Sequence, residues 1–150
     1  MFEITTTSAE QTKALGRRVA QALPSGALVA LYGDIGAGKT AFVQGMALYL
    51  GIKENVTSPT FTLVKEYSSL CHLDIYRIGD ESELFEIGFD EYLDGDRMMA
   101  IEWAERIQDC LPEKRVDIKL TRVEQDIRSI NIWGYYEKQV KEALDESPLY

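Results

Sequence analysis

The chain has 150 residues, of which 45% are hydrophobic and 27% are charged, and its formal net charge is −9. This length suits one domain with a sizeable core, so we expect a single domain over residues 1–150. The negative charge argues against unaided binding to nucleic acid, because surfaces that neutralise phosphates need clustered Lys and Arg. No apolar run reaches the roughly 18 residues of a membrane span, so no membrane partner is expected.

The first residues and the cysteines both predict a cytoplasmic protein. Residues 1–7 lack the basic and apolar regions of a signal peptide. Cys71 and Cys110 have neither metal-ligand spacing nor a CxxC pattern, so reduced thiols are expected. Acidic residues outnumber basic ones between residues 66 and 109. Such a segment is typical of a solvated face or of a docking surface for a basic partner, and the sequence leaves both open.

The first half of the chain alternates between helical and extended patterns. Ser8 and Gln11 resemble a capping box, and helical spacing continues to Leu23 before Pro24 ends the helix. A buried strand is expected next, then a helix that stops at Gly51, then a polar loop and a hairpin turning at residues 68–69. In chain order, these four segments are residues 27–32, 40–50, 52–59 and 60–76.

The second half adds a further apolar strand and a second hairpin. The expected elements are a short helix, an acidic loop with aromatic residues, a strand, a short helix, two hairpin strands and a charged final helix. In chain order, they span residues 82–87, 89–96, 97–103, 104–110, 116–121, 127–133 and 135–144, with the final helix and tail starting near residue 134. Strands that alternate with helices predict an α/β, three-layer, P-loop NTPase-like fold with a mixed, substantially parallel central sheet.

Residues 33–40 carry the most specific motif of the chain. Their sequence G-D-I-G-A-G-K-T fits G-x-x-x-x-G-K-[ST], and it lies between a predicted strand and a predicted helix. Glycines let the backbone N–H groups wrap around a polyphosphate, Lys39 reaches phosphate oxygens, and the Thr40 hydroxyl can bind Mg²⁺. The sequence therefore predicts binding of a nucleoside triphosphate by Asp34, Ile35, Gly36, Ala37, Gly38, Lys39, Thr40 and Ala41.

A P-loop needs an acidic partner for Mg²⁺ at the end of a neighbouring strand, and two residues compete for this role. Glu102 follows an apolar run, as in a Walker B strand. Asp74 lies in a segment whose alternation places His72, Asp74 and Tyr76 on one face. That face is either functional or the polar side of a half-exposed strand. His72 is either part of the site or a structural histidine.

A hydroxyl-rich segment follows the P-loop helix. Nucleotide switches place a loop that senses the γ-phosphate at this point, so Thr57, Ser58 and Thr60 are candidates to contact that phosphate or Mg²⁺. A plain turn at Pro59 explains the same pattern equally well.

Taken together, four blocks of the sequence resemble the TsaE family, small bacterial ATPases of the tRNA threonylcarbamoyladenosine pathway. The blocks read G-D-I-G-A-G-K-T, T-S-P-T-F-T-L-V, H-x-D-x-Y-R and I-E-W, in the family's order and approximate spacing. The resemblance runs from about Thr5 to Trp133. Ala104 replaces a proline that relatives often carry, and Ala41 replaces a second threonine in the P-loop; neither change touches the expected metal role of Thr40.

The resemblance implies a site in which ATP or ADP and Mg²⁺ bind. Lys39 would hold phosphates, Thr40 and Glu102 would hold Mg²⁺, and Asp74 would help to orient water or the metal, so that Lys39, Asp74 and Glu102 form the catalytic set. His72, Tyr76 and Arg77 are possible supporting residues. Two positions would flank the adenine by the same resemblance, Ala9 and Arg128.

The resemblance also implies partners. A TsaE-like ATPase docks, when ATP-bound, on the TsaD–TsaB pair, which modifies the adenosine beside the anticodon of tRNAs reading codons that begin with A. Contact with tRNA would then be indirect, through the complex.

Three rival functions can be compared with this expectation. A GTPase is disfavoured because N-K-x-D and D-x-x-G motifs are absent from the sequence. A small P-loop kinase needs several lid arginines, and only Arg77 and Arg97 lie between Lys65 and Arg106. An ATP-gated binding module with negligible hydrolysis stays open, because no residue stands out as a strong general base or as an arginine finger.

Overall fold

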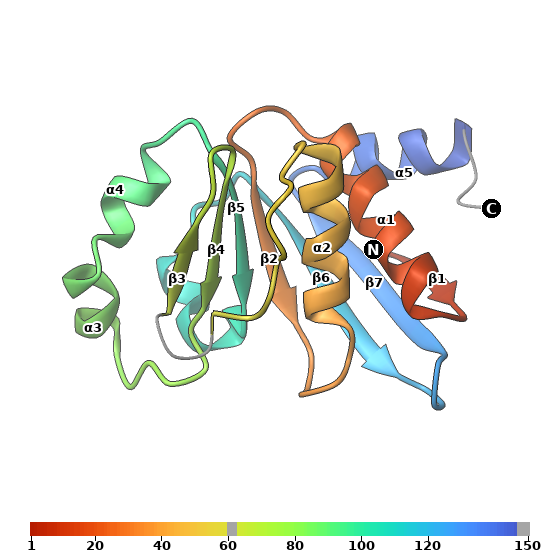
Figure 1. Ribbon diagram of the computed structural model, residues 1–150, viewed down its shortest axis with the longest axis horizontal. Helices are drawn as coiled ribbons and strands as arrows, with labels where there is room; N and C mark the ends of the chain where they lie inside the picture. Colours follow the sequence, from red (N-terminus) through yellow and green to blue (C-terminus); the bar gives the residue numbers. More distant parts are fainter. Residues whose placement is uncertain (60–62, 147–150) are drawn as a thin grey trace.

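The computed structural model describes residues 1–59 and 63–146. These residues form a seven-stranded sheet in the order β1-β7-β6-β2-β5-β4-β3 (Figure 1). The four middle strands β6, β2, β5 and β4 are parallel, whereas β3, β7 and β1 pair antiparallel with their neighbours. This is the mixed, substantially parallel sheet that the sequence predicts. The strands are β1 (Phe2–Thr6), β2 (Leu28–Tyr32), β3 (Val64–Glu66), β4 (Leu70–Asp74), β5 (Met98–Glu102), β6 (Arg115–Arg122) and β7 (Arg128–Gly134).

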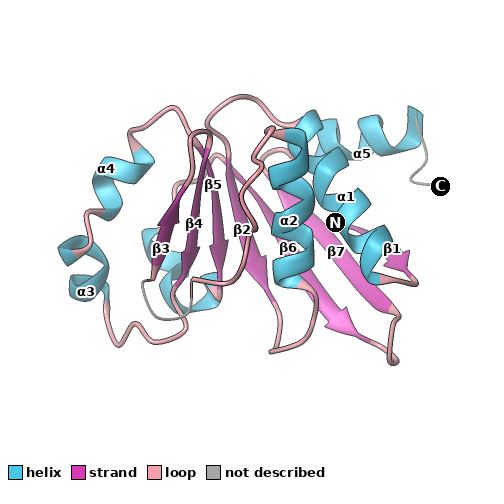
Figure 2. Ribbon diagram, in the orientation of Figure 1, coloured by secondary structure: helices cyan, strands magenta, loops and turns pink. Residues whose placement is uncertain are grey.

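Helices cover both faces of this sheet and make three layers (Figure 2). One face carries α1 (Ala9–Ala22), α2 (Lys39–Tyr49) and α5 (Glu137–Glu146). The opposite face packs against α3 (Glu81–Glu86), α4 (Phe89–Leu93) and the 3₁₀ helix η1 (Ala104–Cys110). No helix in the described part of the chain is long and apolar enough to cross a bilayer.

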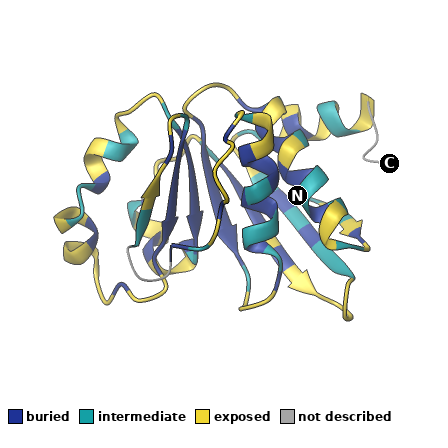
Figure 3. Cartoon of the chain, viewed as in Figure 1, coloured by how far each residue is buried: buried dark blue, intermediate teal, exposed yellow. Residues whose placement is uncertain are grey.

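Strands β2, β4 and β5 are buried on both sides, as strands of a covered parallel sheet must be (Figure 3). In β2, Val29 and Leu31 join the apolar cluster under α1 and α2, while Leu28 and Ala30 join the cluster on the other face. The same alternation in β4 and β5 sends polar residues to the α2 face near the carboxyl ends of the strands, where a P-loop site is expected.

Two glycines bring α1 and α2 unusually close. A Cβ added to Gly45 would lie 1.8 Å from the Lys13 carbonyl oxygen, and one added to Gly16 would lie 2.0 Å from the Phe42 carbonyl oxygen. Because α2 begins at Lys39, this backbone contact fixes where the P-loop helix sits above the sheet.

Most predicted elements are confirmed, with boundaries shifted by one or two residues. The capping interaction at Ser8 is present, because its hydroxyl oxygen accepts from the Gln11 amide at 3.1 Å. Gly51 follows the C-terminus of α2 in the left-handed conformation, with φ at 73°. Both predicted hairpins are present as antiparallel pairs, β3–β4 and β6–β7, although residues 60–62 of the first lie outside the described residues.

The secondary structure differs from the sequence analysis in three places. Residues 2–6 form strand β1, for which no prediction was made, with Phe2 and Ile4 packed on the core. The predicted acidic loop contains helix α4, because Phe89 is buried while Asp90 and Glu91 occupy the first turn, where acidic side chains favour a helix. Tyr76 lies beyond the end of β4 and does not extend the polar face of that strand.

Candidate functional site

The P-loop joins the carboxyl end of β2 to the start of α2 and lines a cavity of about 560 Å³. Gly33, Gly36 and Gly38 have φ of 138°, 80° and 105°, which side-chain-bearing residues rarely adopt. A Cβ added to Gly36 would meet nothing within 4 Å. The cavity is lined by all eight residues that the P-loop motif predicts for phosphate binding, Asp34, Ile35, Gly36, Ala37, Gly38, Lys39, Thr40 and Ala41.

Lys39 lies inside this cradle with its side chain folded back over the loop. The ammonium donates to the Gly33 carbonyl and lies 3.5 Å from the Asp34 carbonyl oxygen. It also lies 3.7 Å from the ring centroid of Trp103, a cation–π contact. Burial lowers the pKa of Lys39, while the negative charge of Glu102 acts in the opposite direction. The charge of Lys39 is thus held in the cavity by carbonyl dipoles and an aromatic face.

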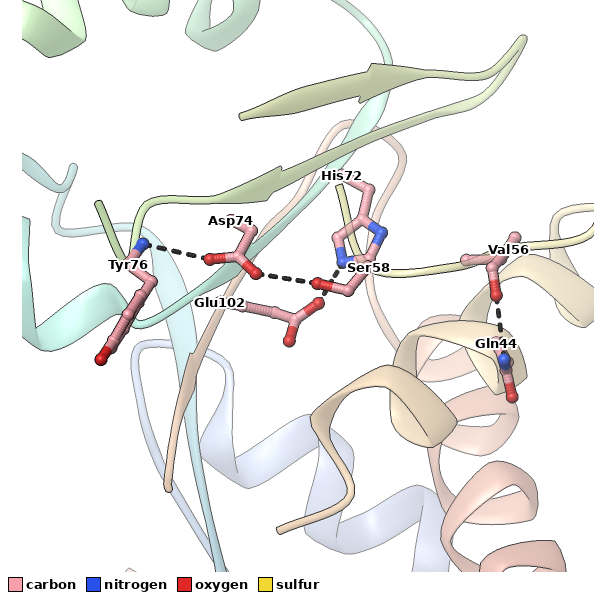
Figure 4. Close-up of polar contacts among 7 residues, drawn as sticks. All are labelled: Gln44, Val56, Ser58, His72, Asp74, Tyr76 and Glu102. Atoms are coloured by element: carbon pink, nitrogen blue, oxygen red, sulfur yellow. Dashed lines mark hydrogen bonds and ion pairs between the residues drawn. The ribbon is translucent and has the colours of Figure 1, made fainter. Parts of the chain in front are cut away.

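Asp74 and Glu102 form an acidic wall opposite the P-loop. The two residues are register partners at the carboxyl ends of the parallel strands β4 and β5, and both are buried. Asp74 accepts hydrogen bonds from the Ser58 hydroxyl at 2.8 Å and from the Tyr76 amide at 3.0 Å (Figure 4). The two residues that the sequence analysis considered for the Mg²⁺ role therefore both line this cavity, as neighbours.

His72 supports Glu102 from within the sheet. It is fully buried, and its Nε2 lies 2.5 Å from Glu102 Oε2 (Figure 4). In the tautomer that carries its proton on Nε2, His72 donates to the Glu102 carboxylate. Within the described residues, His72 Nδ1 has no hydrogen-bond partner. The alternation predicted for β4 therefore holds for His72 and Asp74, and the strand is buried, which rules out a half-exposed strand.

The segment after α2 reaches the acidic wall through Ser58. Gln44 on α2 donates to the Val56 carbonyl at 2.9 Å, and two residues later Ser58 bonds to Asp74 (Figure 4). Ser58 lines the cavity, whereas Thr57 is exposed. Thr60 lies outside the described residues.

Tyr76 and Arg77 lie at the rim of the same cavity. The ring centroids of Tyr76 and Trp103 are 4.7 Å apart, and Cζ of Arg106 lies 5.1 Å from the centroid of the Tyr76 ring. Sequence reasoning did not select Trp103 as a site residue. Its φ of 63° is a strained conformation that costs about 1–3 kcal/mol. The position of Trp103, directly after the carboxylate of Glu102 at the end of β5, could have identified it from the sequence.

Of the two residues expected beside the adenine, Ala9 and Arg128, only Arg128 is seen to contact the P-loop. Ala9 is the first residue of α1. Arg128 donates to the carbonyls of Gly36 and Ala37 at 3.1 and 3.0 Å. Their contact with adenine stays a prediction.

The residues of the cavity fit a Mg²⁺–nucleotide complex. Thr40 and Glu102 supply a hydroxyl and a carboxylate oxygen on facing walls, and Mg²⁺ prefers a few such ligands together with phosphate and water oxygens. No group of three or more His, Cys, Asp or Glu in residues 1–59 and 63–146 is arranged to hold a metal without such help. The site therefore suits a metal that arrives with phosphate.

Comparison with known proteins places this chain in a family. Residues 6–130 match the family described as "Threonylcarbamoyl adenosine biosynthesis protein TsaE". A tRNA threonylcarbamoyladenosine biosynthesis protein TsaE from Bacillus subtilis is 43% identical over 129 residues, covering 83% of this chain and 80% of the relative. One from Treponema pallidum is 42% identical, covering 83% and 95%. The crystal structure of YdiB from Bacillus subtilis superimposes with a TM-score of 0.81 at 34% identity, covering 97% of this chain and 95% of that one.

Proposed function

The chain belongs to the TsaE family of tRNA threonylcarbamoyladenosine biosynthesis, and from its site we propose that it is a Mg²⁺-dependent ATPase that hydrolyses ATP slowly. The observation that carries this proposal is the pairing of a P-loop cradle with two buried, register-matched carboxylates in one cavity. A phosphate-binding loop alone needs no such wall, whereas metal-assisted phosphoryl transfer does.

Each residue of the cavity has a role in the proposed reaction. Lys39 and the backbone amides of the loop bind the phosphates, and Thr40 and Glu102 hold Mg²⁺, with His72 orienting the Glu102 carboxylate. Mg²⁺, when bound, neutralises charge on the phosphate oxygens. Asp74, already bonded to Ser58, is placed to orient the attacking water. Slow turnover is expected, because orientation rather than a strong base provides the catalysis.

The proposed partner is a TsaD–TsaB-type protein pair, and the proposed role is to support repeated rounds of threonylcarbamoyladenosine formation beside the anticodon. A net charge of −9 suits contact with proteins and leaves tRNA binding to the complex. Cytoplasmic localisation belongs to the same proposal.

The arrangement of arginines disfavours a kinase. Within the described residues 63–105, Arg77 lines the cavity and Arg97 does not; Arg97 is paired with Glu66 at 2.8 Å. A lid that neutralises a phosphoryl group in transfer needs several arginines. An ATP-gated binding module with negligible hydrolysis would have the same binding features as the proposed ATPase. Only a measurement of ATP turnover distinguishes the two.

The first experiment measures ATP turnover by the purified chain, alone and with the TsaD–TsaB pair. We expect slow hydrolysis that changes markedly when the pair is added. A rate on the order of 10 per second or faster without partners would refute slow turnover. A rate indifferent to the pair would leave nucleotide binding intact but would reopen the kinase and binding-module alternatives.

Two substitutions test the assignment of the residues. Lys39→Ala should abolish ATP binding, and the matched control Lys53→Ala, at an exposed lysine outside the cavity, should not. Unchanged ATP affinity in Lys39→Ala would overturn the phosphate site. Glu102→Ala should lower Mg²⁺-dependent turnover more than nucleotide affinity, and an unaltered rate would transfer the metal role to Asp74.

A further inference from the structure

Arg128 makes an unusual set of contacts for a surface arginine. It is the first residue of β7, directly after the turn of the β6–β7 hairpin. Its guanidinium donates to five backbone carbonyls. Two belong to the P-loop, Ala37 from Nε at 3.0 Å and Gly36 from Nη2 at 3.1 Å. The other three belong to the hairpin turn and accept from Nη1 at 3.0–3.2 Å: Glu124, Gln125 and Ile127.

The planar fork of arginine suits this task. Nε and Nη2 point the same way along one edge of the guanidinium, so they reach two successive carbonyls at once, and Nη1 serves the turn on the other side. A lysine ammonium of the same charge has no such fixed geometry. Among the described residues, no carboxylate lies within ion-pair distance of Arg128. Its charge therefore stays unneutralised beside the loop that is proposed to bind phosphate.

The two P-loop contacts fix the direction of peptide groups. In a trans peptide, the carbonyl of one residue and the N–H of the next point in opposite directions. Holding the Gly36 carbonyl outward therefore turns the Ala37 N–H inward, where it donates to the Asp34 carbonyl at 3.1 Å. Holding the Ala37 carbonyl outward turns the Gly38 N–H away from Arg128, into the cradle at the start of α2.

Residues Gly36 and Gly38 are the part of the loop that most needs such support. Both have positive φ and no side chain, so the backbone between them has many accessible conformations when nothing holds it. Carbonyls that turned inward would present negative dipoles to a phosphate. An external clamp on the carbonyls thus selects the anion-binding form of the loop.

We propose that Arg128 is a positioning residue that holds the P-loop backbone in its phosphate-binding form and makes that form depend on the β6–β7 hairpin. The proposal rests on the proposed nucleotide binding and deepens it. It differs from the role beside adenine that the family resemblance implies, because the clamp acts on the phosphate cradle and is independent of the base.

The experiment compares affinity for ATP with affinity for inorganic tripolyphosphate, which has no base. The Mg²⁺ complexes of both are titrated into the wild-type chain, Arg128→Gln, Arg128→Lys and the control Arg122→Gln. Arg122 is the register partner of Arg128 across the hairpin and is exposed, so this control removes the same charge from the same place.

We expect Arg128→Gln to lose affinity for both compounds by the same factor, about tenfold or more, since two charge-assisted hydrogen bonds to the loop are lost. Arg128→Lys should recover little of the loss despite its charge, and Arg122→Gln should bind both compounds as the wild type does. Amide hydrogen exchange at Ala37 and Gly38 should accelerate in both Arg128 variants, a local change that a general loss of stability would not confine to the loop.

Two results would overturn the proposal. A loss for ATP with unchanged tripolyphosphate affinity would assign Arg128 to the adenine, and unchanged affinity for both would remove it from the site. Should Arg128→Gln fail to fold, the same comparison is made with Arg128→Lys, which keeps the charge. A wild-type chain that binds neither compound would instead refute the nucleotide site itself, a failure distinct from that of the clamp.

Discussion

Replacing Gly45 by alanine tests the close contact of α1 and α2. Considered as a helix position alone, the change should stabilise the protein, since alanine is favoured over glycine inside helices by about 1 kcal/mol. The structure predicts the opposite. The new Cβ would lie 1.8 Å from the Lys13 carbonyl oxygen, whereas ordinary contacts of this kind begin at 3.4 Å.

The size of the effect follows from what blocks the methyl group. The Lys13 carbonyl is backbone in the middle of α1, so it cannot rotate aside as a flexible side chain would. The two helices must separate or shift, and overpacking of this kind costs about 1–3 kcal/mol. Because the clash is with backbone, we take the upper part of that range. The gain in helix propensity offsets about 1 kcal/mol, which leaves a net loss of about 1–2 kcal/mol.

Thermal unfolding of Gly45→Ala measures this loss, which corresponds to a fall in Tm of about 2–8 °C for a domain of this size. Gly95→Ala is the matched control, because its Cβ would meet nothing nearer than the Tyr92 carbonyl oxygen at 3.5 Å. The control should keep the wild-type Tm. A Tm for Gly45→Ala equal to or above that of the wild type would refute the packing argument. Since α2 begins at Lys39, the variant should also bind ATP more weakly while still folded.

Three further predictions concern buried polar groups. His72→Leu should lower kcat more than it changes KM, because Glu102 loses its donor at 2.5 Å, and His72→Gln should recover part of the rate; equal kcat in all three proteins would remove His72 from the site. Burial raises the pKa of both Cys71 and Cys110, so iodoacetamide at pH 8 should alkylate the native protein slowly, and mass spectrometry should find Cys71 modified only after denaturation. Burial and the neighbouring Asp117 raise the pKa of Tyr32, so the stability that its proton confers is complete below its unfolded pKa of about 10 and is lost as the pH rises above that value. Denaturant unfolding from pH 9 to 11 should show this decline, and Tyr32→Phe should flatten it.

Local patterns in the sequence were sufficient for most of the fold. The glycines of residues 33–38, the apolar run before them and the helical spacing after them each constrain one short segment, and together they predict the P-loop correctly. The errors are also local in origin. Strand β1 is five residues long and belongs to the sheet only because β7 lies beside it, and α4 is a single turn that burial of Phe89 stabilises.

The site was less predictable, because its parts meet through contacts between distant segments. Glu102 and Asp74 were seen as competitors, since nothing in the sequence states that β4 and β5 are neighbours in matching register. Arg128 and Gly36 are 92 residues apart, and no local pattern reveals that a hairpin arginine faces the P-loop. The left-handed backbone of Trp103 and its contact with Lys39 are likewise set by the tertiary structure.

The contacts within the cavity divide it into parts that can move and parts that cannot. Asp74 and Glu102 are held by the backbone ladder between β4 and β5, so their positions are fixed by the core of the sheet. Lys39 donates to the Gly33 carbonyl, and because an ammonium has three donors it can also bind a phosphate oxygen. Ser58, in the loop after α2, is linked to the acidic wall through its hydrogen bond to Asp74.

A change of nucleotide should therefore act first on Lys39 and on the segment around Ser58. That segment is also tied to α2 through Gln44 and the Val56 carbonyl, so a displacement at the phosphates reaches the protein surface by way of residues 56–59. Thr57 is exposed at this point. We accordingly expect nucleotide-dependent hydrogen exchange to be concentrated in residues 56–59 and the P-loop, while the amides of β4 and β5 stay protected in every nucleotide state.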